Sequence, residues 1–297
     1  MSKSVGIRAA AAAAHTRGVV LVILAATLWS TAGFFVRLLD LDAWTILAWR
    51  SVFTALSLAS FVVFLNGRQT MTKVRAIGWP GLAAVPIAAV AMGCFVFALK
   101  LTTVANVMVV YATVPFVAAG VAYVWFGERL SGRFLLASAV ALVGILTVVG
   151  FAARLQDVAG SAVAFLMTLA FGVQLVMARR FPRLEMAPVN AFGAALCAIV
   201  CWPYSAGGIP GLRELAILAL FGITNGALGY LLFLTGGRHI PSGEAGLIGL
   251  IDVVLGPLWV WLGFGEQPGR AALAGGALVL AAVIWYLTVA QRSQTDS

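Results

Sequence analysis

Charged side chains are scarce in this chain. Asp, Glu, Lys and Arg make up 10% of its 297 residues, whereas apolar residues make up 62%. An ordinary soluble domain has about 25% charged residues, and the mean hydropathy of +1.04 is that of a strongly apolar chain. Because a water-soluble fold could not bury so much apolar surface, this composition excludes a soluble protein and predicts an integral membrane protein.

Cysteine and histidine are also rare, and the sequence lacks the common motifs of metal and phosphate chemistry. Cys94, Cys197 and Cys201 lie in apolar runs, where a thiol packs as a small side chain. His15 and His239 are the only histidines, and there is no phosphate loop, HExxH or GxSxG motif. We therefore expect no cofactor, no metal, no enzymatic activity and no ATP-driven pump.

Long apolar runs dominate what is present. A membrane-spanning helix needs about 20 apolar residues, since the hydrocarbon layer is about 30 Å thick and each helical residue rises about 1.5 Å. Ten such runs occur, and two of them contain one ionisable residue each, Arg50 and Asp252. The predicted spans are residues 18–36, 43–65, 76–99, 101–127, 134–153, 158–178, 186–212, 215–237, 245–265 and 271–291. Continuous runs of this length favour helices over barrel strands, so we predict an all-α polytopic membrane protein with ten transmembrane helices.

The positive residues predict how the chain crosses the membrane. With Arg50 left aside, thirteen Lys and Arg lie in one alternate set of connectors, which includes both terminal segments, and five lie in the other set. Cytoplasmic loops retain positive charge, so we expect a multi-pass protein of a bacterial inner membrane with both termini in the cytoplasm. The formal charge of +9 does not indicate nucleic-acid binding, because these residues are dispersed among connectors rather than gathered on one face.

The two halves of the chain resemble each other. Phe126-Gly127-Glu128 recurs as Phe264-Gly265-Glu266, and residues 28–37 align with 170–179 at nearly the same offset. Five spans per copy is an odd number, so the copies would insert in opposite directions, as in transporters built from inverted repeats. We predict a basic, poorly ordered tail at residues 1–17, five-helix repeats at 18–153 and 158–291 around a central cavity, and a second tail at 292–297.

Ionisable and polar side chains at bilayer depth are the candidate functional residues. A charge there costs about 2.5–3.5 kcal/mol on insertion scales, so Asp252 is expected to bind a substrate ammonium, to carry a coupling proton or, equally, to fix helix packing. Arg50 would contact a carboxylate, although snorkelling or pairing with a carbonyl group is the favoured interpretation. The other candidates are mid-span aromatic and amide side chains, for which packing or interhelical hydrogen bonds are the alternative: Trp29, Tyr111, Phe171, Gln174, Asn225 and Tyr230.

Prolines and glutamates mark further positions in or beside the spans. Three prolines lie inside spans, where each removes a backbone hydrogen bond and permits a gating bend: Pro86, Pro115 and Pro257. Glu128 and Glu266 follow the ends of two spans, where capping or pairing with Arg129 or Arg270 is expected. We therefore assign gating to the prolines and a structural role to the glutamates.

These features resemble the drug/metabolite transporter superfamily, in particular its EamA-type ten-helix branch. The resemblance covers about residues 18–290, and it rests on Trp29 to Arg37, on Trp49-Arg50, and on the segments that end in Gly127-Glu128 and Gly265-Glu266. Within that branch, Leu28-Trp29-Ser30-Thr31 and the mid-span aromatic residues look like the YddG-type aromatic amino-acid exporters. The resemblance implies two five-helix repeats around a central cavity, with outward movement of aromatic and other neutral amino acids.

We therefore expect a secondary transporter that works by alternating access, with a small-molecule substrate and the lipid bilayer as its partners. Efflux of cationic drugs or other amphipathic metabolites is the alternative, and it would require Asp252 to face the cavity. A phosphorylated-sugar or nucleotide-sugar exchanger would need several deep Lys or Arg side chains, and only Arg50 is present. A membrane enzyme would show a cluster of titratable groups, and a structural subunit would not need inverted repeats. The sequence leaves the oligomeric state and the coupling ion open.

Overall fold

The computed structural model describes residues 2–75, 77–127, 132–150, 155–182, 184–206, 208–240 and 242–295, and every regular element within these ranges is helical. The first half contains α1 (Ser2–Ser30), α2 (Ala32–Leu38), α3 (Ala43–Asn66), η1 (Gly67–Gln69), α4 (Thr70–Arg75), α5 (Gly78–Leu101), α6 (Val104–Tyr111), α7 (Val114–Phe126) and α8 (Gly132–Gly150). The second half contains α9 (Leu155–Arg180), α10 (Met186–Cys201), η2 (Trp202–Tyr204), α11 (Leu212–Phe221), the π-helical segment η3 (Gly222–Leu228), α12 (Gly229–Gly236), α13 (Ser242–Phe264) and α14 (Arg270–Thr295). The predicted all-α class is confirmed for the described residues.

Seven of the described helical segments are long and apolar enough to cross a membrane. They are Ala13–Leu38, Ala43–Thr72, Gly78–Leu101, Val104–Phe126, Leu155–Arg180, Met186–Tyr204 and Leu212–Gly236, and shorter apolar stretches follow at Gly132–Thr147, Ile248–Phe264 and Arg270–Tyr286. Large apolar side chains such as Phe64 and Leu155 are 87% and 88% exposed, which suits surfaces in contact with lipid. The membrane-protein prediction is confirmed, and the count of ten spans stays a prediction.

Several helix ends differ from the predicted bounds. The backbone is helical from Ser2, where a run of six alanines has the highest helix propensity, and the tail at residues 1–17 stays a prediction. The helix α14 likewise extends beyond the predicted end of its span at residue 291 and ends at Thr295. The run predicted as one span at 186–212 ends in η2, because Pro203 and Pro210 lack a backbone donor and disfavour helix in the preceding residue. The predicted end of the first repeat, residue 153, lies outside the described residues, as do residues 1, 296 and 297.

Two spans of the first half are interrupted between α-helices. Thr31 separates α1 from α2, and both its N–H and its hydroxyl donate to the carbonyl of Leu28, at 3.2 and 2.6 Å. Residues 112–113 separate α6 from α7, and Pro115 follows directly in the first turn of α7. Because proline cannot bond to the carbonyl four residues back, a break at this point is expected. In the second half, η3 interrupts the span formed by α11 and α12.

The three predicted gating prolines therefore occupy different settings. Pro115 lies beside a helix break, whereas Pro86 and Pro257 lie inside the continuous helices α5 and α13. The surrounding turns accommodate those two prolines without ending the helix. A gating role for all three remains a prediction.

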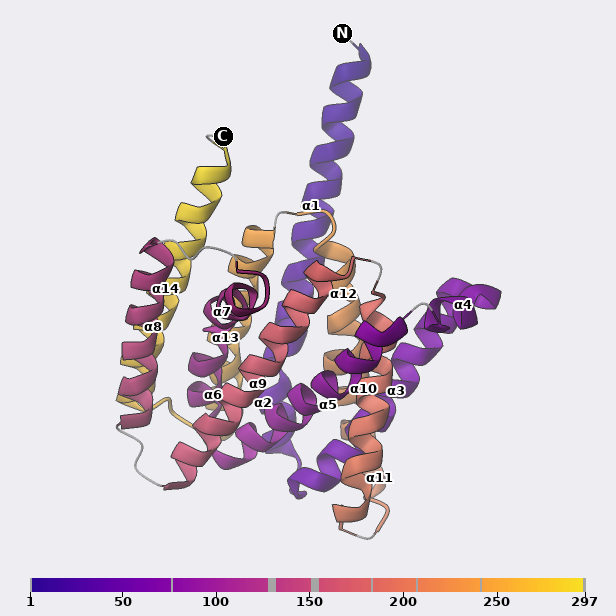
Figure 1. Ribbon diagram of the computed structural model, residues 1–297. Helices are drawn as coiled ribbons and strands as arrows, with labels where there is room; N and C mark the ends of the chain where they lie inside the picture. Colours follow the sequence, from indigo (N-terminus) through magenta and orange to yellow (C-terminus); the bar gives the residue numbers. More distant parts are fainter. Residues whose placement is uncertain are drawn as a thin grey trace.

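The helices pack into a bundle in which most long axes run in roughly the same direction (Figure 1). α5 packs against α9 and α10, α1 against α12 and α13, α3 against α10, and α8 against α14. α1 begins and α14 ends at the same end of the bundle (Figure 1). The largest buried apolar cluster draws on both halves of the chain, with Ile46, Leu99 and Met108 from the first and Leu218 and Phe221 from the second. The halves are therefore joined by one core.

The glycines of the two Phe-Gly-Glu motifs share one backbone conformation. Gly127 and Gly265 have φ of +67° and +69°, in the left-handed region that favours glycine. Their N–H groups donate to the carbonyls of Tyr123 and Trp261 at 2.8 and 2.9 Å. Each glycine therefore ends the helix before it, α7 or α13, while Glu128 lies outside the described residues.

The helix α3 starts at an acidic N-cap. Asp42 accepts hydrogen bonds from the backbone N–H of Thr45, at 3.0 Å, and from the Thr45 hydroxyl. Burial raises the pKa of Asp42, but the hydrogen bonds from Thr45 outweigh burial, so the pKa lies below its ordinary value. This cap defines where the helix that carries Arg50 begins.

Candidate functional site

A cavity lies inside the bundle, between residues from both halves of the chain. Its volume is about 130 Å³, measured as space for the centres of water molecules, which is about ten times the minimum that one water needs. Nine helical segments contribute its lining: Trp29, Arg50, Ala88, Ala91, Met92, Phe95, Tyr111, Met167, Phe171, Gln174, Asn190, Asn225, Gly226, Tyr230 and Asp252. The cavity therefore has room for a small organic molecule.

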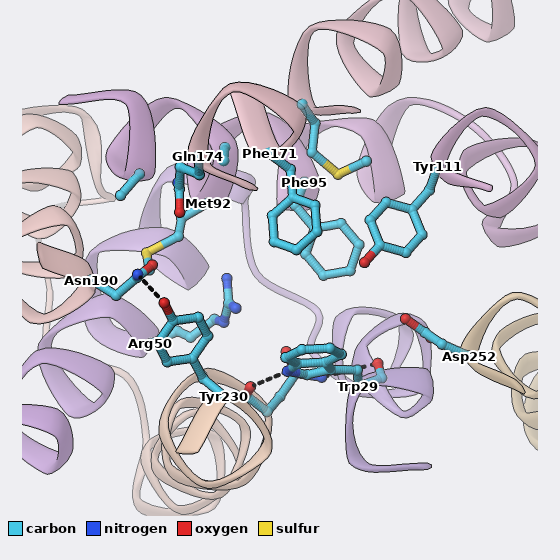
Figure 2. Close-up of a pocket in the computed structure, with 15 residues that line it drawn as sticks. Trp29, Arg50, Met92, Phe95, Tyr111, Phe171, Gln174, Asn190, Tyr230 and Asp252 are labelled. Atoms are coloured by element: carbon cyan, nitrogen blue, oxygen red, sulfur yellow. Dashed lines mark hydrogen bonds between the residues drawn. The ribbon is translucent and has the colours of Figure 1, made fainter. Parts of the chain in front are cut away.

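Trp29 is held beside the cavity by the π-helical segment η3. Its indole Nε1 donates to the main-chain carbonyl of Asn225 at 3.1 Å, and its ring lies 5.1 Å from that of Phe233. The Asn225 side-chain amide donates in return to the carbonyls of Leu28 and Trp29, at 3.1 and 3.0 Å. The Leu28 carbonyl also accepts from Thr31, whereas the Trp29 carbonyl lies at the end of α1, where a helix lacks its own donors. The π-helical turn therefore places Asn225 where it caps α1. Asn225 positions Trp29, and Trp29 offers its ring to the cavity (Figure 2).

Aromatic rings lie across the cavity from Trp29. The centroids of Tyr111 and Phe171 are 5.9 Å apart with an interplanar angle of 48°, and Phe95 lines the same cavity (Figure 2). Tyr111 is the last residue of α6, so the helix break places its ring at the cavity. Aromatic side chains bury large apolar areas and attract cations or other rings at their faces. This part of the cavity is suited to an aromatic or apolar group.

Two neutral polar groups have hydrogen-bonding capacity left for a ligand. The Asn190 amide donates to the carbonyl of Met186 at 3.0 Å and to the hydroxyl of Tyr230 at 2.7 Å. Because the Tyr230 hydroxyl is an acceptor in that bond, its own proton remains free to be donated. Gln174 is 5% exposed, and its side-chain amide forms no hydrogen bond with any residue that the structure describes. Tyr230 and Gln174 are therefore the neutral groups best placed to orient a polar ligand.

Arg50 and Asp252 are the charged residues of the lining. Each is 5% exposed, and Arg50 Nε, Arg50 Nη1 and Asp252 Oδ1 have no hydrogen-bond partner within the described part of the chain. The Arg50 guanidinium carbon lies 4.4 Å from the ring centroid of Phe221, a cation–π contact. Figure 2 shows the two charged groups on opposite sides of Trp29, so they do not pair with each other. Buried charges without partners are costly, and both residues are candidates for binding an ionic ligand.

The cavity brings together all seven residues that were predicted to bind the substrate: Trp29, Tyr111, Phe171, Gln174, Asn225, Tyr230 and Asp252. The three prolines do not line it. Asn190 was missed although its amide lies in an apolar run like that of Gln174, so the same criterion could have found it. Arg50 was considered but left out of the predicted set. Met92 and Phe95 were also missed, because apolar residues in a span carry no signal that separates cavity lining from ordinary packing.

A second polar cluster joins helices at the end of the bundle where α2 ends. Arg37 Nε donates to Glu266 Oε2 at 2.7 Å, while its two terminal nitrogens donate to the carbonyls of Leu99 and Thr102. The N–H of Val104, at the start of α6, donates to Glu266 Oε1 at 3.0 Å. The expected pairing of Glu266 with Arg270 is therefore wrong. The packing of α2 against α13 brings Arg37 to Glu266 instead. The other expected pair, at 128 and 129, lies outside the described residues.

Comparison with protein families identifies the class of this chain. The model of the EamA-like transporter family matches twice, over residues 16–150 and 158–288. The chain belongs to this family. As an EamA-like transporter, it is a membrane transporter of small molecules rather than an enzyme, and the cavity is the candidate site for its substrate.

One solved structure, "Crystal structure of protein", resembles this EamA-like transporter over nearly its whole length. The similarity covers 93% of this chain and 98% of the other, with a TM-score of 0.67 and 19% sequence identity. At that identity the likeness shows the fold alone. Comparison with curated proteins gives no match.

Proposed function

We propose that this EamA-like transporter exports aromatic and other neutral amino acids across a bacterial inner membrane, with both termini in the cytoplasm. The composition of the cavity carries this proposal. The cavity is enclosed by the rings of Trp29, Tyr111 and Phe171. It is also lined by Arg50 and Asp252, whose charged groups have atoms without a partner among the described residues. An aromatic amino acid combines a ring, a carboxylate and an ammonium group, which is the set of groups that such a lining can bind.

Transport would proceed by alternating access between two inverted five-helix repeats, at residues 18–153 and 158–291, that cross the membrane ten times. The helix contacts support this proposal because they occur in matched sets. The packing of α5 against α9 corresponds to the packing of α12 against α1. In the same way, the packing of α7 against α9 corresponds to that of α13 against α1. Two further contacts, between α8 and α14 and between α3 and α10, each join a helix of one repeat to its counterpart in the other. An exchange of conformation between the two repeats would open one end of the cavity and close the other.

The cluster around Arg37 would hold one end closed during this cycle. It links α2, α5, α6 and α13 through Arg37 and Glu266, so separation of these helices at that end would break several hydrogen bonds at once. By the distribution of Lys and Arg, this end would face away from the cytoplasm. We therefore assign the Arg37 cluster to the outer gate.

Transport by the purified protein in liposomes tests the proposal. Wild-type protein should carry labelled phenylalanine or tryptophan, and Trp29→Ala or Tyr111→Ala should slow this flux because each removes an aromatic surface of the cavity. Trp79→Ala is the matched control, since Trp79 is 80% exposed on the outside of the bundle, and its flux should equal that of the wild type. Absence of amino-acid flux together with transport of a cationic dye would show that the amino-acid assignment is wrong.

Efflux of cationic drugs is the second candidate, and Asp252 is the observation that favours it. Its carboxylate lines the cavity, is 5% exposed and leaves Oδ1 without a partner within the described residues. In that case Asp252→Asn should abolish efflux of a cationic dye. Amino-acid flux with and without a pH gradient, in the wild type and in Asp252→Asn, would separate proton exchange from facilitated diffusion.

A further inference from the structure

Arg50 is a buried cation whose donors are largely unused. No carboxylate of the described residues forms an ion pair with it, and neither Nε nor Nη1 has a hydrogen-bond partner among them. An arginine side chain stays protonated in proteins, so it cannot avoid the cost of burial by losing its charge. A buried charge in this state calls for an anionic partner, which the described residues do not supply.

The structural roles expected for Arg50 leave these donors unexplained. A snorkelling arginine places its charged head in the hydrated interface, but Arg50 is 5% exposed inside the bundle. Pairing with backbone carbonyls would occupy Nε or Nη1, and neither is occupied. The contact with Phe221 lies over the ring at 4.4 Å from the guanidinium carbon, and it leaves the N–H groups of Nε and Nη1 without an acceptor among the described residues.

We infer that Arg50 binds a carboxylate group of the transported metabolite. Arg50 lines the same cavity as Trp29 and Tyr230, and the planar fork of donors on its guanidinium matches a carboxylate in geometry as well as in charge. Asp252 lies on the far side of Trp29 (Figure 2), so it leaves the place beside Arg50 free. The inference rests on the proposed function and adds to it the residue that selects metabolites bearing a carboxylate over simple amines.

Three ligands that differ in one charged group test the inference. They are phenylalanine, 3-phenylpropanoate, which lacks the ammonium, and 2-phenylethylamine, which lacks the carboxylate. Binding of each to the purified full-length protein in detergent is measured by calorimetry. Because charged hydrogen bonds are lost, Arg50→Gln should weaken binding of 3-phenylpropanoate and phenylalanine by about 10- to 100-fold, with the amine changed by less than about twofold. Arg213→Gln is the matched control, because it removes the same charge from an exposed position in the first turn of α11, away from the cavity, and should leave binding of all three ligands unchanged.

Equal weakening of all three ligands in Arg50→Gln, or undiminished binding of 3-phenylpropanoate, would overturn the inference. Arg50→Lys keeps the positive charge but lacks the planar fork, and it replaces the glutamine variant if that variant does not fold. It should bind 3-phenylpropanoate at least about threefold more weakly and 2-phenylethylamine as the wild type does, and equal losses for both ligands would contradict the assignment.

Failure of the proposed function would be distinguishable from failure of this inference. In the first case, wild-type protein in liposomes would carry no labelled phenylalanine. Binding of 3-phenylpropanoate then decides the inference separately. Binding by the wild type that is lost in Arg50→Gln supports the carboxylate site, and absence of binding by the wild type rejects it.

Discussion

Replacement of Glu266 by glutamine should loosen the end of the bundle that Arg37 holds together. Glu266 accepts two hydrogen bonds there, from Arg37 Nε at 2.7 Å and from the N–H of Val104 at 3.0 Å. The substitution removes the negative charge and places an amide NH₂ group, which accepts no hydrogen bond, on one of the two positions. Arg37 would keep its bonds to the carbonyls of Leu99 and Thr102, so the cluster would weaken without disappearing.

The size of the effect follows from the exposure of the pair. A hydrogen bond to a charged group contributes about 1.5–3 kcal/mol. Both side chains are partly exposed, at 23% for Arg37 and 22% for Glu266, and solvent screening lowers the value toward the roughly 0–1 kcal/mol of a surface pair. We therefore expect a loss of about 1–2 kcal/mol, which would shift the equilibrium between the closed and open forms of this end by about 5- to 30-fold.

Accessibility of the cavity measures this shift. A membrane-impermeant thiol reagent, added from the side on which α2 ends, is used to label Gln174→Cys in protein whose native cysteines have been replaced by serine. The labelling rate should rise by about 5- to 30-fold when Glu266→Gln is added. Glu214→Gln is the control, because it removes the same charge from the first turn of α11 and should leave the rate unchanged. If Glu266→Gln labels no faster than this control, the Arg37 cluster does not close the cavity.

Three stability measurements in detergent follow from other parts of the fold. Asp42→Ala should lower the free energy of unfolding by about 1 kcal/mol because α3 loses its N-cap. The pKa of Asp42 is lowered in the folded state. The wild type should therefore lose this contribution as the pH falls below about 3.9 and through the folded-state pKa. In melting curves, Asp42→Asn should show no such acid-dependent loss of stability. Gly226→Ala should lower the free energy of unfolding by about 1–3 kcal/mol because the added Cβ would collide with the Thr54 side chain. Gly93→Ala is the control, since a Cβ there meets open space, and it should show no comparable drop in melting temperature. Asn225→Ala should lower the free energy of unfolding by about 1–3 kcal/mol in the same assay, because the Trp29 carbonyl loses its donor and the Leu28 carbonyl keeps only those of Thr31.

Several features were predictable from the sequence because the bilayer imposes them. Apolar runs of helix length are visible before any fold is known, and they locate most of the spans. Polar groups inside such runs must find a partner or a cavity, which is why residues chosen by type and depth alone, from Trp29 to Asp252, line one cavity. The repeated Phe-Gly-Glu motif likewise marked two helix ends, where Gly127 and Gly265 adopt the same left-handed conformation.

Residues with the same local pattern were distinguished only by the tertiary structure. Asn225 and Gln174 are both amides within apolar spans, yet the Asn225 side chain caps α1 while the Gln174 side chain forms no hydrogen bond to a described residue. Glu266 pairs with Arg37, 229 residues away, and not with Arg270. The hydrophobic pattern along the chain determines which segments enter the membrane, because each segment exchanges water for lipid by itself. The partner of each polar group depends instead on which helices lie side by side, and only the packing of the two halves against each other decides that.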